Sequence, residues 1–415
     1  MAQANARFAP EFQVQINDLP VPSALRASIM SVTCQSGIEG ADRVELSLVN
    51  ENLRWLDHPL LAVDRELSLS VGYAPDPLEQ VFVGNIVGQS ATFPSSGAPA
   101  LTVVAHDRRH RLQQRTSSRW FAIPTQCHGN FPMSDLSVTS LVSLEHLLIP
   151  IFEPVGAAIS AVIGGIEVAV NLGDPDARQK MIRKQVGESN YDFLQRIAKE
   201  NGWDMIIDHS GPLGGTTLRF VSPLSHLIPD VTLKYGRSLA DFNPRLTTVG
   251  QIVSVSARIW KPEIKMEFNV KVSWDWDRSS LSVNISPGIG LSAAPPGLQK
   301  SNELDVLLLE EPVNQFTGPR VIVRKLIDRL NQRLTASGSV VGDPRLKPTM
   351  VVRIEGVGER FGGLYRLTSV THTLDSGGFR TNFEARKEIW FGSIPLLEQG
   401  AVRVQVQGQT VGVGG

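Results

Sequence analysis

Two distant stretches of the chain decide the fold: residues 67–107, LSLSVGYAPDPLEQVFVGNIVGQSATFPSSGAPALTVVAHD, and residues 351–387, VVRIEGVGERFGGLYRLTSVTHTLDSGGFRTNFEARK. Each contains a strand that ends in Gly, a second strand that ends at a Thr, a Ser/Gly turn, and a last strand beside charged residues. Alternating apolar residues predict strands, and Gly/Ser clusters predict turns. The shared order predicts one β module that occurs twice. Unrelated β-meanders also share turn chemistry, so a chance likeness stays open here.

The rest of the first hundred residues is strand-like too. Val14 and Ile16 alternate with polar residues, as do Val44 and Leu46. Short strands broken by Gly and Pro are typical of a small barrel or a sandwich. The predicted fold class is mainly β with α/β insertions: two similar β-barrel domains plus a mixed α/β domain.

The clearest helix is predicted between the two β modules. Apolar residues between 191 and 198 fall on one helical face, and Asn201-Gly202 supplies a left-handed end. Residues 203–207 and 217–221 then predict a strand pair around a Gly-Pro turn.

These patterns divide the chain into five parts. They are a first β-barrel domain (1–118), a mixed α/β domain (119–230) with an apolar segment (141–172), a second β-barrel domain (231–260 and 340–392), an insertion with a strand, a Pro/Gly loop and a helix at 320–334 (261–339), and a tail that is flexible or ordered by a partner (393–415).

Composition excludes several classes of protein. The 415 residues are 42% hydrophobic and 20% charged, which is ordinary for a soluble chain of several domains. Lys+Arg 40 against Asp+Glu 41 gives a net charge of -1, so nothing favours a nucleic-acid binder. Only two cysteines, Cys34 and Cys127, are present, which excludes a disulfide scaffold and suits a reducing compartment. The N-terminus has no apolar signal region, so cytoplasmic assembly is expected.

The segment 154–172 is apolar except for Glu167. Its length lies near the lower limit of about 17–25 residues for a membrane-spanning helix. The internal acid and the lack of aromatic or basic anchors favour a buried or interface segment instead. Ile159 and Ile163 are therefore the candidate partner-interface residues, and membrane contact is the alternative.

The catalytic motifs that we searched for are absent. There is no GxxxxGK[ST] motif, and the glycines from Gly356 to Gly362 lie between predicted strands, which indicates a hairpin turn. His106, Asp107 and His110 lack the spacing of a zinc protease and lie among arginines, which favours a solvated polar turn. No pair of carboxylates is singled out. We expect no enzymatic activity, no cofactor and no metal.

Five motifs in order resemble the phage late control D family. They are FQVQINDLPVP with SVTCQSGIEGADRVELSLVN (12–22 and 31–50), VVAHDRRHRLQQRTSSRWF (103–121), GESNYDFLQRIAKENGWDM (187–205), LKYGRSLADFNPRLTTVGQIVSVSARIW (233–260) and GDPRLKPTMVVRIEGVGERFGGLYRLTSVTHTLDSGGFRTNFEAR (342–386). Members of this family are baseplate hub proteins of contractile tails, related to the head of type VI secretion spike proteins. The apolar stretch at 141–172 is longer than the usual link in the family.

The resemblance implies tube-type β-barrel domains and a homotrimer. Three chains with two modules each offer six near-equivalent faces, which adapts a trimeric spike to a hexameric tail tube. The implied partners are a separate spike protein, the tail tube protein and other baseplate proteins, in a virion-like tail or injection particle. Two alternatives are a hub-associated peptidoglycan hydrolase and a membrane-engaging component that acts through residues 154–172.

Overall fold

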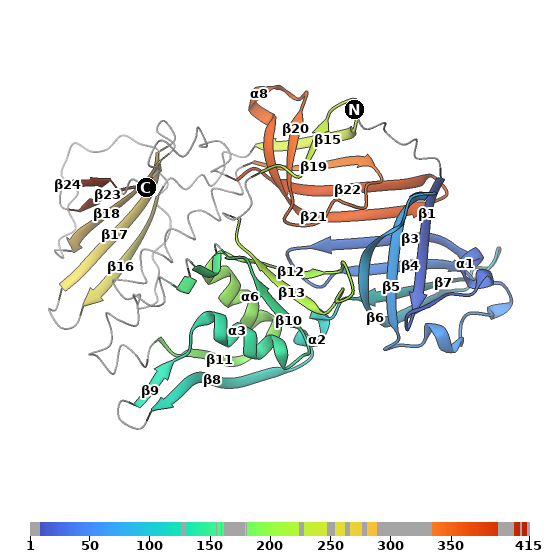
Figure 1. The fold of residues 1–415 in the computed structure, drawn as a ribbon, viewed down its shortest axis with the longest axis horizontal. Coiled ribbons are helices and arrows are strands. Elements are labelled where there is room, and N and C mark those ends of the chain that lie inside the picture. Colours follow the sequence, from blue (N-terminus) through green and yellow to red (C-terminus); the bar gives the residue numbers. More distant parts are fainter. Residues whose placement is uncertain are drawn as a thin grey trace. The chain divides into compact units, whose positions relative to one another are not determined.

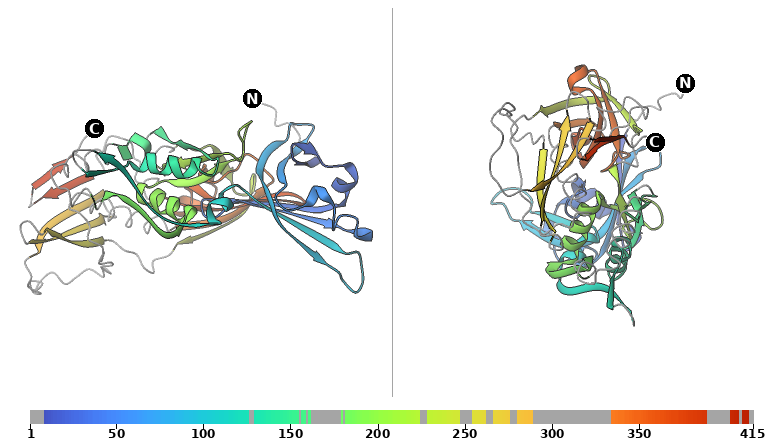
Figure 2. Two further views of the ribbon diagram at one scale, coloured as in Figure 1. Left: turned by 90° about the horizontal axis from the view of Figure 1, so that it is seen from below. Right: turned by 90° about the vertical axis from the view of Figure 1, so that its left-hand side faces the viewer.

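The structure is a computed structural model (Figures 1 and 2). It describes residues 9–125, 129–154, 156–158, 160–161, 179, 181–223, 228–246, 254–261, 266–275, 280–288, 334–388, 402–406 and 409–412. Contacts between residues divide the chain into two compact units, and each is treated by itself.

The first β module occupies the N-terminal part of the chain. Apolar residues on alternate positions of its strands, such as Leu67, Leu69 and Val71, are fully buried in a common core. Its elements are β1 (Ala9–Ile16), β2 (Leu19–Pro20), α1 (Ser23–Ser28), β3 (Ile29–Gly37), β4 (Arg43–Val49), η1 (Glu51–Leu53), η2 (Pro59–Leu61), β5 (Glu66–Ala74), β6 (Glu79–Thr92) and β7 (Ala100–His106).

The second β module is assembled from two separate parts of the sequence. A short helix lies between two of its strands where the glycines from Gly356 to Gly362 predict a turn. Its elements are β14 (Val231–Lys234), β15 (Leu239–Leu246), β19 (Leu334–Val341), β20 (Val351–Glu355), α8 (Gly358–Phe361), β21 (Gly363–Asp375) and β22 (Gly378–Arg386).

The two modules share one strand order. In the first, neighbouring strands follow the order β1-β5-β6-β7-β4-β3, and in the second the order β14-β20-β21-β22-β19-β15. Each strand of one series has its counterpart at the same place in the other. The modules differ at one end, where β1 pairs antiparallel with β5 and β14 pairs parallel with β20. Six matching places go well beyond shared turn chemistry and support the repeat.

The two modules are joined edge to edge, a connection that the sequence did not predict. Strand β21 pairs antiparallel with β3, from Ser369 opposite Gly37 to Leu374 opposite Val32. This pairing makes one sheet of 13 strands. Main-chain groups at a strand edge need partners, and each module here supplies an edge to the other. The predicted class, mainly β with α/β insertions, is confirmed.

The mixed domain has three layers. Among the described residues, helices α3 and α6 pack between two three-stranded sheets, and the core draws on Phe121, Val142, Phe193 and Phe220 from all three layers. Its elements are α2 (Arg109–Gln113), β8 (Thr116–Thr125), β9 (Gly129–Pro132), α3 (Asp135–Leu144), β10 (Ile149–Phe152), β11 (Arg183–Ser189), α6 (Asn190–Asn201), β12 (Asp204–Asp208) and β13 (Thr217–Val221); the sheet orders are β11-β8-β9 and β10-β13-β12.

The predicted central helix is confirmed as α6. Ser189 precedes it, and its hydroxyl oxygen accepts a hydrogen bond from the N–H of Asp192 at 3.0 Å. Gly202 ends it at φ 70°, a left-handed conformation that glycine adopts without strain. The strand pair after the helix is also confirmed.

The second unit contains a five-stranded sheet, which differs from the expected boundaries. Residues 254–260 were expected in the second β module, but β16 (Ser254–Lys261) pairs with β17 (Met266–Asp275). The remaining strands are β18 (Ser280–Gly288), β23 (Val402–Val406) and β24 (Gln409–Gly412). Strand β16 pairs antiparallel with its neighbour in the sequence, β17, and this local pairing takes β16 away from the module. The predicted helix at 320–334 lies outside the described residues except for its last residue, Leu334, which begins β19.

Candidate functional sites

A buried cluster of charges lies where the first β module meets the mixed domain. Arg109 is fully buried, and its guanidinium donates to Asp107 at 2.8 Å and to Asp42 at 2.5 Å. It also donates to the main-chain oxygens of Gly37 at 3.3 Å and Met205 at 3.1 Å. A single side chain therefore ties β3, the loop before β4, and β12 together.

His209, from the mixed domain, completes this cluster. Its Nδ1 accepts a hydrogen bond from the N–H of Val83, so its Nε2 carries the proton that is donated to Asp42 at 2.8 Å. Burial by itself raises the pKa of Asp42, but Arg109 and then His209 outweigh it and hold that pKa below its usual range. Burial likewise opposes ionisation of Arg109, whose pKa Asp107 and Asp42 nevertheless raise. The cluster is a charged guanidinium between two carboxylates.

Asp42, Asp107 and His209 offer ligand atoms within 4.8 Å of one another, so a metal ion has to be considered. The residues do not fit one, because the Arg109 guanidinium already lies against both carboxylates and would repel a cation. The role of this cluster is to join two domains.

The sequence interpretation of the HDRRH motif is wrong at its centre. Asp107 and Arg109 are fully buried, where a solvated polar turn was predicted. The alternation of β7 continues past His106 and turns Asp107 inward, and buried charges need partners. Those partners, Asp42 and His209, lie far away in the sequence, and no local pattern links them to the HDRRH motif. The signal in the sequence that could have revealed this burial was a run of charged residues directly after a buried strand.

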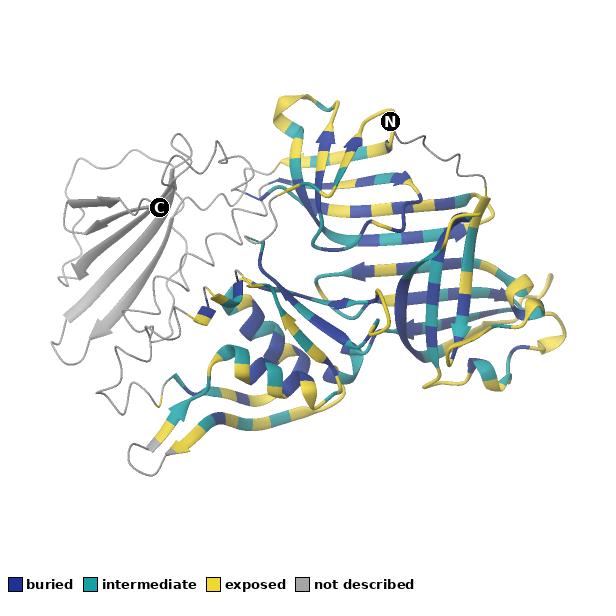
Figure 3. Ribbon diagram, in the orientation of Figure 1, coloured by how far each residue is buried: buried dark blue, intermediate teal, exposed yellow. Residues whose placement is uncertain are grey.

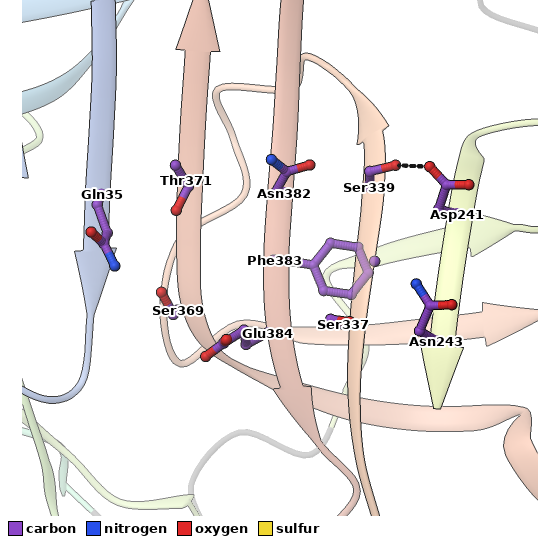
Figure 4. Close-up of a pocket in the computed structure, with 11 residues that line it drawn as sticks. Gln35, Asp241, Asn243, Ser337, Ser339, Ser369, Thr371, Asn382, Phe383 and Glu384 are labelled. Carbon is purple, nitrogen blue, oxygen red and sulfur yellow. Dashed lines mark hydrogen bonds between the residues drawn. The ribbon is translucent and has the colours of Figure 1, made fainter. Parts of the chain in front are cut away.

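A polar groove crosses the outer face of the second β module. It encloses about 410 Å³ and spans β15, β19, β22, β21 and β3 (Figure 4). Its lining consists mainly of hydroxyl, amide and carboxylate side chains: Gln35, Asp241, Asn243, Ser337, Ser339, Ser369, Thr371, Asn382 and Glu384, with Gly338 and Phe383.

The groove lacks the side chains that activate a serine nucleophile. Its lining contains no histidine, cysteine or lysine, and the one hydrogen bond drawn there runs from the Ser339 hydroxyl to Asp241 at 2.8 Å (Figure 4). A serine nucleophile requires a base of histidine or lysine type beside it. The small polar side chains on this face of the sheet instead form a hydrophilic surface.

The mixed domain exposes large apolar side chains on two opposite layers. Trp120 on β8 is 73% exposed and Val186 on β11 is 75% exposed, on the face opposite to buried Phe121. On the other sheet Ile149 and Ile151 are exposed, and Leu147 before them is 76% exposed. The exposed positions appear along these strands in Figure 3. Exposed apolar side chains that gather into a large patch often mark surfaces that meet a partner, which makes these two sheet faces candidates for such contacts.

The candidate interface residues Ile159 and Ile163 lie outside the described residues. The start of their segment packs on its own domain: Gly156 lies so close to Trp203 and Ser222 that a Cβ would be 2.7 Å from the Ser222 side chain. Ser160 donates to Asn201 at 2.7 Å. Within the described residues no helix is long and apolar enough to cross a membrane.

Comparisons with known proteins extend these observations. No family model and no curated protein matches the chain. Among solved structures, a tail protein from Neisseria meningitidis matches over 95% of this chain and 100% of its own, at 12% identity and a TM-score of 0.60. The 43 kDa tail protein of prophage MuSo2 from Shewanella oneidensis matches over 91% and 98%, at 10% identity and a TM-score of 0.60.

A component of the type VI secretion system of Escherichia coli also matches. It covers 90% of this chain and 76% of its own, at 10% identity and a TM-score of 0.53, and is described as similar to tail proteins of bacteriophage T4. At these identities the likeness shows a shared fold. The chain has the fold of phage tail proteins, as the resemblance of its motifs led us to expect.

Proposed function

We propose that this chain is a structural baseplate hub, a homotrimer that adapts a trimeric spike to a hexameric tail tube in a phage-like contractile tail or injection system. The duplicated β module carries the proposal: two modules with the same strand order lie in one sheet of one chain. A sixfold partner repeats its contacts every sixth of a turn, so a threefold ring can meet all of them only if each chain offers two similar surfaces.

The fold shared with tail proteins supports this proposal. Two of the structures described above are tail proteins, and the third is a secretion component likened to tail proteins. The separate spike, the tube protein and other baseplate proteins are the proposed partners, and the proposed location is a virion-like particle assembled in the cytoplasm.

A reconstruction of the assembled particle tests the proposal. We expect three copies of the chain per ring, with the six β modules at one height along the axis. Six copies per ring, or modules at two heights, would contradict the adaptor role.

We also propose that the chain is not an enzyme and uses no cofactor. The groove has no histidine, cysteine or lysine in its lining, and the buried cluster is neutralised by Arg109. A peptidoglycan zymogram with purified protein should show no clearing. Clearing of the gel that is lost in a single variant such as Glu384→Gln would contradict this proposal. It would favour the alternative of a peptidoglycan hydrolase.

A further inference from the structure

The end of helix α3 in the mixed domain carries a leucine where most helices carry glycine. The N–H of Leu147 donates to the oxygen of Leu144 at 3.0 Å, and the N–H of Leu148 donates to the oxygen of Ser143 at 3.1 Å. This pair of bonds requires a left-handed residue between them, which is usually Gly and sometimes Asn. Leu147 adopts that conformation at φ 59°, whereas Gly202 fills the equivalent place after α6 at φ 70°.

Leucine is a costly residue at this position. In the left-handed conformation the Cβ of an L-residue crowds the backbone. The side chain of Leu147 is 76% exposed, so its burial in the chain offsets little of that cost. Leu53 of the first β module is also left-handed, at φ 57°, but is more than half buried. A side chain that is both strained and exposed in the free chain indicates that its contacts are made with a partner.

Leu147 continues a stripe of exposed leucines along α3. Leu141 is 46% exposed and Leu144 is 52% exposed, and residues three apart on a helix lie side by side. The other side of α3 carries Val138 and Val142, which are fully buried in the core of the domain. Helix α3 is therefore apolar on two sides, although a surface helix needs only one apolar face towards its own core.

The side chains that border this stripe need no counter-charge from a partner. Both oxygens of Glu145 accept hydrogen bonds from the guanidinium of Arg119, at 2.6 and 2.9 Å. Burial lowers the pKa of His146, so its imidazole is neutral at pH 7. Complementarity therefore calls for a partner with an uncharged, apolar contact surface.

The size of the stripe suits a single helix. Its three leucines, together with Ile149 and Ile151 on β10, expose roughly 150–300 Å² of apolar surface, at about 60–120 Å² for each fully exposed side chain. A stable interface between whole proteins buries about 800 Å² on each partner, which is far more. Addition of a strand is disfavoured as well, because the edge strand β10 contains Pro150, which has no N–H to donate.

We infer that an amphipathic helix of another protein in the particle packs along α3, with its apolar face on Leu141, Leu144 and Leu147. Side chains three residues apart form a ridge that fits between the side chains of a second helix. The inference rests on the proposed place of the chain in an assembled particle. It adds the kind of partner that the mixed domain binds and the residues that bind it.

The variant Leu147→Asn separates this contact from the fold. Asn tolerates the left-handed conformation, so the melting temperature should stay unchanged or rise by up to about 4 °C. The share of chains found in assembled particles should fall about fivefold or more, as for a central contact residue. Leu53→Asn is the matched control at a left-handed leucine outside the stripe, and it should be incorporated normally. Normal incorporation of Leu147→Asn would overturn the inference.

Photo-cross-linking then tests whether the partner segment is a helix. A benzophenone amino acid is placed at position 141, 144 or 147 of the full-length chain, and cross-linked peptides from assembled particles are sequenced. Three residues of α3 rise about 4.5 Å, so the attachment points should move along one partner segment in steps of three or four residues. Steps of one or two residues would indicate a strand, and attachment to another copy of this chain would indicate a contact between copies. Either result overturns the inference.

The remaining results are also decisive. Particles that contain the benzophenone chain without any cross-link would show that the stripe faces solvent, and the inference fails. If these chains do not enter particles, the two Asn variants decide. None of these failures affects the adaptor role, which depends on the number of copies per ring. A ring of six copies would contradict the adaptor role and leave the helix contact on α3 standing.

Discussion

The core side of β7 in the first β module is wholly apolar, whereas its counterpart β22 in the second β module carries a buried polar side chain. In the first module Leu101 and Val103 fill the core side of β7. In the second, Thr381 is fully buried on β22 beside His372 on β21. The same strand order is built on both interiors. Strand order therefore depends on the alternation of inward and outward residues and on turn positions, and individual core side chains can vary.

The two modules are attached to the mixed domain in a similar way but with different chemistry. Arg109 donates to the oxygen of Met205, and Arg366, also buried, donates to the oxygen of Pro223 at 2.6 Å. Arg109 in addition neutralises two buried carboxylates, Asp42 and Asp107. The attachment of the first module should therefore be the more sensitive to a single substitution.

The largest effect should come from Arg109→Met. The substitution leaves two buried carboxylates without a counter-charge, which lowers the free energy of unfolding by about 3–5 kcal/mol. Denaturation in urea measures it. Arg43→Met is the matched control, because the Arg43–Glu45 pair is largely exposed and contributes less than about 1 kcal/mol. Equal losses in the two variants would contradict a central role of the buried cluster.

The second module should be the more sensitive to acid. Burial lowers the pKa of His372 to about 4, from an ordinary 6.5. The unfolded chain then binds a proton that the folded chain does not, so stability is full above pH 6.5 and falls as the pH drops towards 4. The loss over this window is about 3 kcal/mol.

His372→Gln should flatten the dependence of the free energy of unfolding on pH between 6.5 and 4. Thr381→Val is the control, because it removes the hydroxyl next to the imidazole at 2.9 Å but keeps the buried imidazole. It should lower stability by about 1 kcal/mol at pH 7 and keep the wild-type slope. An unchanged slope in the Gln variant would show that other groups govern acid sensitivity.

The sequence predicts the repeat, the mixed domain and α6 because each depends on local periodicity and end signals such as Gly202. It does not predict the β3–β21 joint, since a pairing across more than 300 residues leaves no local pattern. The cluster around Arg109 is missed for the same reason. Asp and His are seldom fully buried, and only the fold brings Asp42 to Arg109 and His209 to Asp42.

A smaller effect should separate two glycines of β6. A Cβ at Gly84 would be 2.2 Å from the main-chain oxygen of His106, whereas nothing lies within 4 Å of one at Gly88. Gly84→Ala forces the backbone of β6 or β7 to shift and should lower the free energy of unfolding by about 1–3 kcal/mol. Gly88→Ala, the matched variant on the same strand, should be neutral or slightly stabilising. Thermal melts of both variants measure the difference, and equal melting temperatures would show that the module absorbs the extra methyl group.

Substitutions at the exposed apolar side chains of the mixed domain, which belongs to neither β module, should change the free energy of unfolding least. They should nevertheless have a large effect on assembly. Leu147 and Ile151 lie within the apolar segment 141–172, just before the residues 154–172 that the sequence assigns to a buried or interface position, and they are 76% and 47% exposed. Replacing both with Asp should alter the free energy of unfolding by less than about 0.5 kcal/mol per site, because the side chains lose little burial. It should nevertheless keep the chain out of assembled particles, since a buried interface does not accept unpaired charges. Val63→Asp, at a 52% exposed apolar site of the first module, is the control and should be incorporated normally. Incorporation of the double variant at the wild-type level would mean that this surface faces solvent in the particle, and the interface assigned to the apolar segment would then have to lie in its remaining residues.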